Sequence, residues 1–215
     1  MRRLILSISL LFVFTLAFSQ YKMIKPELYI GTNQGVNLWP HVGFKPSVAQ
    51  IFDVRYKGGF TLRYVNLKYF GFQTELNYSA QGWSETSATG EIYSHRFDYL
   101  ELPILAHIYF GKKNTKFFVN LGPEIRYMVA DAATTPFSEG AGYQQTTEIE
   151  NRFDYGITGG LGVEYRTKKA GAFQLEARYH FGLGNVFNAT KKDYFSASNN
   201  QAISVSIVYL FNVLK

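Results

Sequence analysis

The chain has 215 residues, a formal net charge of +6, 16 Tyr, 19 Phe and 19 Gly, and no cysteine. The lack of cysteine excludes disulfide bonds, thiolate metal sites, a cysteine nucleophile and a lipid-modified N-terminal cysteine. The basic residues form no stripe with interleaved aromatics, so nucleic acid is not expected as a partner. Abundant Tyr, Phe and Gly favour strands joined by tight turns over helices.

The first 19 residues have the form of a secretory signal peptide. Arg2 and Arg3 supply a positive start, residues 4–18 are mostly apolar, and Ala17 and Ser19 are the small residues that a signal peptidase reads. A retained membrane anchor is the alternative, but the apolar run is shorter than the roughly 20 residues of a spanning helix. We therefore predict a signal peptide at residues 1–19 and one mature domain at residues 20–215.

Beyond the signal peptide, apolar and polar residues alternate in segments of roughly ten residues, the span of a tilted membrane strand. Such alternation places successive side chains on opposite faces of a strand. The sequence predicts eight strands, at residues 27–37, 56–64, 70–82, 97–110, 117–129, 153–166, 173–184 and 202–211.

The fourth and fifth of these strands read as a hairpin joined by the charged turn GKKNTK at residues 111–116. One face of the hairpin is apolar throughout, and the other mixes charged, polar and apolar residues. If Phe110 pairs with Phe117 across the turn, Glu101 lies opposite Arg126 on the mixed face.

The connections between the predicted strands alternate between short and long. In an up-and-down barrel, alternate connections emerge at the same end. The pattern therefore predicts one end with short turns and both termini, and a second end with long loops, as in transmembrane β-barrels. The short connections are residues 65–69, 111–116 and 167–172, and the long ones are residues 38–55, 83–96, 130–152 and 185–198.

Alternation alone also fits a soluble lipocalin-like barrel with its apolar face inside. Three observations favour the inverted arrangement. Glycines accompany the charges on the mixed face, as a crowded lumen requires. Aromatics gather towards the ends of the apolar face, like the two aromatic girdles at the membrane interfaces. The final strand ends with Tyr209 and Phe211 close to the C-terminus. We therefore predict an all-β fold, an eight-stranded antiparallel up-and-down transmembrane β-barrel in the outer membrane.

The charged face then lines the lumen. We interpret its residues as a network of mutually satisfied charges, because an unpaired buried charge costs several kcal/mol. A gated ion path through rearranging pairs is the alternative. The predicted lumen charge network comprises Arg63, Glu75, Glu101, Glu124, Arg126, Glu164, Glu176, Arg178 and His180.

The four histidines raise the question of hydrolase chemistry. His107 and His180 are predicted to point inward, and His41 and His95 to lie in loops. Asp154 lies near His180 at the rim, but no spacing places a serine beside them as a triad requires. The histidines also show no metal-ligand spacing. We therefore expect no catalytic, cofactor-binding or metal-binding residues, no cofactor, and no enzymatic activity.

Four segments resemble the PorT-like outer-membrane β-barrel proteins of Bacteroidetes, and the likeness extends over the whole mature chain. This resemblance implies a small eight-stranded barrel, and the AFSQ ending at residues 17–20 is also typical of that group. The namesake is linked to maturation of cargo of the type IX secretion system. The segments are YLELPILAHIYFG (99–111), FFVNLGPEIRY (117–127), FDYGITGGLGVEY (153–165) and LEARYHFGLGNV (175–186).

The expected function is therefore that of a small integral outer-membrane barrel with a structural or interaction role and four surface loops. A secretion-associated barrel is one alternative, and a lipid A-modifying enzyme is another. The expected partners are outer-membrane lipids and the outer-membrane assembly machinery, with secretion components as further candidates. The barrel is expected to be a monomer.

Overall fold

The computed structural model describes residues 23–45, 47, 49–87, 90–134, 149, 151–167, 169–187 and 196–214. The predicted signal peptide at residues 1–19 lies outside these ranges. Within them, no helix is long and apolar enough to cross a membrane. The described residues form nine strands: β1 (Met23–Asn37), β2 (His41–Lys45), β3 (Arg55–Leu67), β4 (Phe70–Thr86), β5 (Ile92–Phe110), β6 (Thr115–Ala133), β7 (Phe153–Arg166), β8 (Ala172–Gly182) and β9 (Ala197–Asn212).

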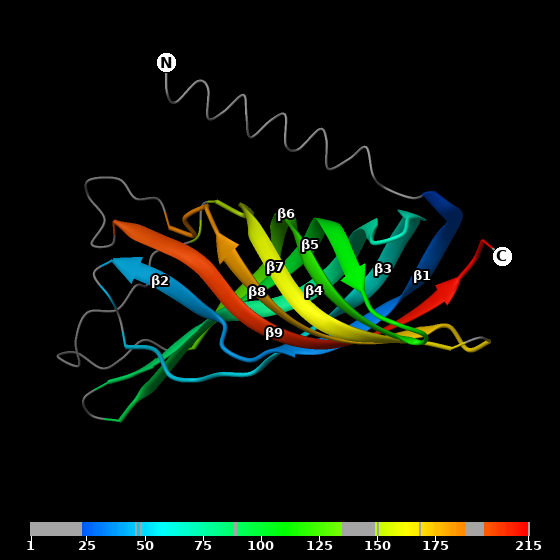
Figure 1. Ribbon diagram of the computed structural model, residues 1–215. Coiled ribbons are helices and arrows are strands. Elements are labelled where there is room, and N and C mark those ends of the chain that lie inside the picture. The colour runs from blue at the N-terminus through cyan, green and yellow to red at the C-terminus, as the bar shows by residue number, and fades with distance from the viewer. Residues whose placement is uncertain are drawn as a thin grey trace, which may run out of the picture.

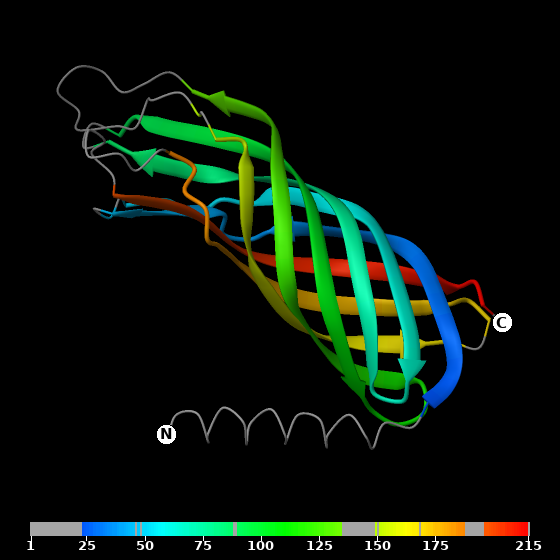
Figure 2. The same ribbon diagram turned by 90° about the horizontal axis from the view of Figure 1, so that it is seen from above.

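The strands form one antiparallel sheet that closes on itself (Figures 1 and 2). From β3 to β9 each strand pairs with the next along the chain, and β1 pairs with both β3 and β9. Eight strands therefore complete the ring, which confirms the predicted eight-stranded antiparallel up-and-down barrel. The additional strand, β2, lies inside the predicted loop at 38–55 and pairs with β9 beyond the end of β1.

The register of the β5–β6 hairpin agrees with the sequence prediction. Phe110 pairs with Phe117, and Glu101 pairs with Arg126. Side chains of the apolar face point outward around the ring and stay exposed, for example Phe60, Leu76, Ile104, Leu121, Ile157, Leu161, Leu175 and Ile207. A continuous exposed apolar surface of this kind is typical of contact with membrane lipid. We call it the apolar band.

The two ends of the barrel differ. The β3–β4, β5–β6 and β7–β8 turns lie at the same end as the start of β1 and the finish of β9 (right in Figure 1). We call this the short-turn end. In transmembrane β-barrels the short turns face the periplasm and the longer loops face outward.

At the opposite end, four strands continue further than the sequence predicts. β9 begins at Ala197 instead of residue 202, and β4, β5 and β6 run on past their predicted bounds. β4 and β5 extend into the predicted loop at 83–96 and leave only residues 87–91 as their connection, and β6 continues past its predicted end. The pattern inverts here: apolar Trp83 points inward and Arg96 points outward. Strand ends predicted from an apolar outer face therefore fall short of the true ends. We call residues 83–86, 92–98 and 129–133 of these strands the projecting wall.

Two further predictions need correction. His41 and His95 lie in strands β2 and β5, not in loops. His95 is buried because its side chain points to the inner side of the projecting wall. The seventh predicted strand was placed at 173–184, but β8 ends at Gly182, where its pairing with β7 stops at Gly156.

Candidate functional site: the charged lumen

The candidate site is the interior of the barrel, because alternation turns every second side chain inward. All nine residues of the predicted lumen charge network have buried side chains. They come from six neighbouring strands, β3 to β8: Arg63, Glu75, Glu101, Glu124, Arg126, Glu164, Glu176, Arg178 and His180. Charges removed from water in this way need partners of opposite sign and hydrogen bonds.

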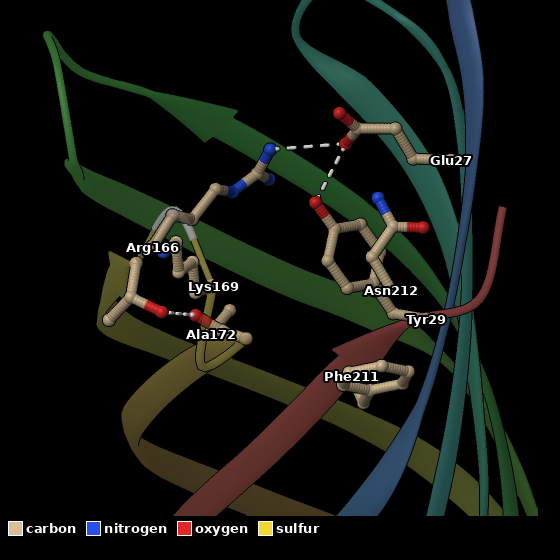
Figure 3. Close-up of a pocket in the computed structure, with 9 residues that line it drawn as sticks. Glu27, Tyr29, Arg166, Lys169, Ala172, Phe211 and Asn212 are labelled. Carbon is tan, nitrogen blue, oxygen red and sulfur yellow. Dashed lines mark hydrogen bonds and ion pairs between the residues drawn. The ribbon is translucent and has the colours of Figure 1, made fainter. Parts of the chain in front are cut away.

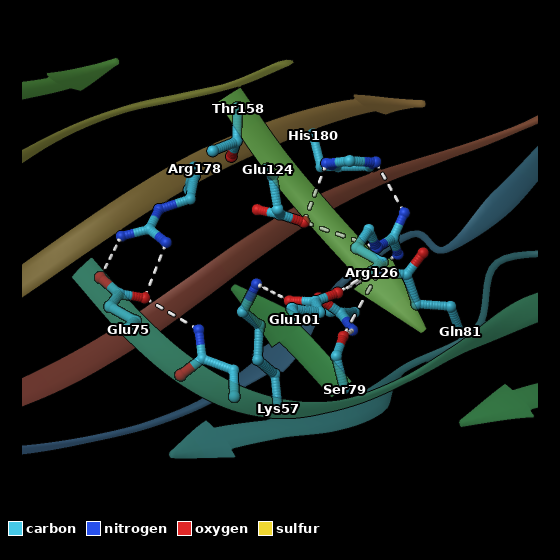
Figure 4. Close-up of polar contacts among 12 residues, drawn as sticks. Lys57, Glu75, Ser79, Gln81, Glu101, Glu124, Arg126, Thr158, Arg178 and His180 are labelled. Carbon is cyan, nitrogen blue, oxygen red and sulfur yellow. Dashed lines mark hydrogen bonds and ion pairs between the residues drawn. The ribbon is translucent and has the colours of Figure 1, made fainter. Parts of the chain in front are cut away.

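Arg126 on β6 is the centre of the part of the network that lies nearer the long-loop end of the barrel (Figure 4). Its guanidinium lies 3.2 Å from Glu101 on one side and 3.2 Å from Asp154 on the other. The Nε atom lies 3.5 Å from Glu124. The ring of Tyr99 covers one face of the guanidinium, with Cζ 4.5 Å from the ring centroid, a cation–π contact. One fully buried cation thus serves three carboxylates.

Glu101 also binds a second cation. The Nζ atom of Lys57, on β3, lies 2.6 Å from Glu101 Oε2. Gln81 donates a hydrogen bond of 3.0 Å to the other carboxylate oxygen. The cross-strand pair of Glu101 with Arg126 is therefore part of a larger cluster drawn from β3, β4, β5 and β6.

His180 connects Arg126 to Glu124. Arg126 Nη1 donates to His180 Nε2 over 2.6 Å, so this ring nitrogen acts as an acceptor. The other ring nitrogen, Nδ1, lies 3.1 Å from Glu124 Oε1 without forming a hydrogen bond to it.

Two ion pairs cross the lumen between opposite strands. Arg178 on β8 holds Glu75 on β4 through both terminal nitrogens, at 2.9 and 2.7 Å. Arg63 on β3 forms an ion pair with Glu164 on β7. In both pairs the two strands lie four places apart in the ring of eight, the greatest separation the ring allows. Side chains therefore bridge the full width of the lumen.

Glycines make room for these bridges. A Cβ atom on Gly162 would lie 2.5 Å from the Phe118 ring and 2.3 Å from the backbone oxygen of Leu175. On Gly160 it would lie 2.6 Å from a carboxylate oxygen of Glu176. All three distances are shorter than a van der Waals contact, so these two inner positions of β7 are glycine because charged and aromatic side chains from neighbouring strands occupy the space.

An aromatic cluster fills the barrel beyond the charged layer, within the projecting wall. Trp83 is its largest member and contacts Phe44 of β2 at a centroid distance of 5.1 Å. His95 packs against Trp83 at 5.0 Å, and burial lowers the pKa of its imidazole despite the nearby carboxylate of Asp131. The cluster comprises Val42, Phe44, Trp83, Tyr93, Phe97, Tyr99, Met128, Val186 and Phe187.

Around the two lumen histidines, this geometry builds ion pairs and hydrogen bonds. Among the described residues, the hydrogen bonds and ion pairs of His107 and His180 go to Arg, Asn and Glu side chains. Asp154 and His180, the two residues weighed for a triad, both bind Arg126. In the same part of the chain, no group of three or more His, Cys, Asp or Glu residues is placed to hold a metal ion.

A family model described as the outer membrane protein beta-barrel domain matches residues 11–188. The chain belongs to this outer-membrane β-barrel family. Its location is accordingly the outer membrane. A comparison with curated proteins finds no match to the chain.

Solved structures of outer-membrane barrels are similar to this chain. The outer membrane protein OprG from Pseudomonas aeruginosa is 12% identical, with a TM-score of 0.53, over 88% of this chain and 97% of OprG. Neisserial surface protein A is 10% identical, with a TM-score of 0.48, over 87% of this chain and 100% of that protein. At such low identity, the likeness to OprG shows the fold alone.

The site has further members beyond the nine residues of the predicted network; alternation already predicts that two of them, Lys57 and Arg166, face the lumen. Lys57, Asp154 and Arg166 all bind network residues, and Asn120 links Glu176 to His107. Their inward positions follow from alternation, so the period-two pattern contains the signal for them. The aromatic cluster carries no such signal, because it forms where the pattern inverts.

Proposed function

We propose that this protein is a closed, non-enzymatic outer-membrane barrel that acts by presenting its projecting wall to partners outside the cell. The observation that carries this proposal is strand length. β5 and β6 each have 19 residues, whereas a tilted strand crosses the hydrocarbon with about 9–11. The remaining residues extend the barrel wall beyond the membrane on the long-loop side.

The projecting wall is built as a rigid element. The aromatic cluster packs against its inner side, and β2 pairs with β9 to support the cluster from the opposite wall. Backbone pairing continues to the tip, where Thr86 pairs with Ile92. Binding sites placed on rigid elements lose less conformational entropy on association than sites on flexible loops.

The lumen favours an interaction role over transport. Two ion pairs bridge opposite walls, and the aromatic cluster lies above them. Eight strands enclose an interior that side chains can fill completely. We propose further that the protein is a monomer, inserted by the outer-membrane assembly machinery.

Photo-crosslinking in living cells tests this proposal. A photoreactive residue at Ile92, which is exposed at the tip of the wall, is expected to form a discrete adduct with a protein or glycan. The matched control is Lys112, which is exposed on a short turn at the other end. Adducts at Lys112 with none at Ile92 would contradict a role for the wall.

A second candidate is a secretion-associated barrel, and the segment resemblance to PorT-like proteins favours it. In that case the partners are periplasmic or membrane-bound secretion components, and the short-turn end meets them. Adducts at Lys112 together with a secretion defect in a deletion strain are the expected results. Wild-type secretion in the deletion strain would eliminate this candidate.

A further inference from the structure

Lysines that are spread along the sequence gather at the short-turn end of the barrel. The structure describes eight lysines, and six of them lie there, near the start of β1, on the three short turns or at the start of β6. The other two, Lys45 and Lys57, lie in β2 and in the lumen. We call the six residues the lysine collar: Lys25, Lys68, Lys112, Lys113, Lys116 and Lys169.

The collar carries uncompensated charge. Within the described part of the chain, none of its six ammonium groups has a carboxylate within 4.0 Å. Two acids near this rim already bind Arg166: Glu164, the cross-strand neighbour of Lys116, and Glu27, which also accepts a hydrogen bond of 2.9 Å from Tyr29. Unpaired cations confined to one end of the molecule create a local positive field there.

The collar lies beside the interfacial aromatics of the apolar band. Phe110 stacks on Phe117 at 5.9 Å next to the β5–β6 turn, and Phe173 contacts Tyr209 at 5.1 Å next to the β7–β8 turn. Aromatic girdles of this kind mark the level of the lipid headgroups. The lysines just beyond the girdle are therefore at the depth of the headgroup phosphates.

One concave site opens within the collar (Figure 3). A cavity of about 300 Å³ lies between the β7–β8 turn and the last residues of β9. Lys169 and Arg166 line it from one side, and Phe211, whose side chain belongs to the apolar band, lines it from the other. Glu27 also lines the cavity, but Arg166 pairs with it at 3.3 Å, so the net charge there comes from Lys169. The cavity therefore joins cationic groups to a lipid-facing wall, as the headgroup of an amphipathic anion requires.

We propose that the lysine collar binds the phosphates of anionic phospholipids in the periplasmic leaflet, and that the cavity beside Lys169 seats one headgroup. Acyl chains would then run along the apolar band, which begins at Phe211. Phosphate groups are also carried by lipid A, but that lipid belongs to the opposite leaflet, where the described arginines Arg55, Arg96 and Arg152 are each paired with an aspartate.

Native mass spectrometry of the folded barrel tests the proposal. The protein in detergent is mixed with equal amounts of phosphatidylglycerol and phosphatidylcholine of matched chains. The wild type is expected to retain phosphatidylglycerol preferentially. The triple variant Lys68→Gln, Lys112→Gln, Lys169→Gln, with one change on each short turn, is expected to bind it about tenfold more weakly or worse.

The matched control removes three cations at the other end through Lys45→Gln, Arg96→Gln and Arg152→Gln. Its affinity for phosphatidylglycerol is expected to stay within about twofold of the wild type, since these residues lie outside the collar. Heat-modifiability on gels verifies that each variant is folded. Equal retention of both lipids by the wild type, or an equal loss in the control, would overturn the proposal.

Two further comparisons test the assignment to the periplasmic leaflet and to the cavity. A preference for purified lipid A over phosphatidylglycerol that disappears in the collar variant would overturn the choice of lipid. Single substitutions distinguish binding in the cavity from attraction by the positive charge of the whole collar. Lys169 lines the cavity and Lys68 does not, so Lys169→Gln is expected to weaken binding more than Lys68→Gln. Equal effects of the two would overturn the assignment of a headgroup to the cavity.

Discussion

Replacing Arg126 by alanine is expected to lower the free energy of unfolding by about 3–5 kcal/mol, the range for removing one partner of a buried ion pair. The change leaves Glu101, Glu124 and Asp154 in the lumen without their shared cation. It also removes the hydrogen bond to His180. Urea unfolding of barrels folded into lipid vesicles, followed by heat-modifiable gel mobility, measures the loss.

The control for this prediction is Arg96→Ala. Arg96 forms an ion pair of similar length, 2.7 Å to Asp98, but its side chain is 50% exposed on the projecting wall. Exposed pairs contribute about 0–1 kcal/mol. If Arg126→Ala destabilises the barrel no more than Arg96→Ala does, the lumen network does not hold the barrel together.

An arginine at Leu161 is expected to destabilise the inserted barrel by about 2–4 kcal/mol, the cost of a cation near the bilayer midplane. Leu161 is on the outer face of β7 and is 67% exposed. Phe153 and Tyr165 mark the two aromatic ends of the same strand, so Leu161 lies between the girdles. The same vesicle unfolding assay measures the effect.

The matched change is Ile92→Arg. Ile92 is exposed to a similar extent, 62%, but lies at the tip of the projecting wall. Here the expected cost is about 0–1 kcal/mol, because the side chain already meets water. Equal costs at the two positions would mean that the apolar band does not face lipid at Leu161.

The fold was largely predictable because each strand of a barrel produces alternating apolar and polar residues within a short segment of the sequence. Alternation identified all eight strands of the ring, and the short turn between Phe110 and Phe117 determined that Glu101 faces Arg126. Turn length fixes the register of a hairpin, so a cross-strand neighbour can be read from the sequence.

The pairs across the lumen could not be read in this way. Arg63 and Glu164 are 101 residues apart, and Arg178 and Glu75 are 103 apart. Whether they meet depends on the tilt and stagger of the whole barrel, which no local pattern encodes. The projecting wall was missed for another reason: outside the membrane its inner face is apolar and its outer face polar, the reverse of the pattern used to find the strands.

Single-channel recording in planar bilayers tests most directly whether lumen side chains close this barrel. Protein whose insertion is verified by heat-modifiability is expected to give no discrete current steps, since the Arg63–Glu164 and Arg178–Glu75 pairs bridge the lumen. Stable, reproducible conductance steps from the wild-type protein would contradict the account and favour a gated ion path.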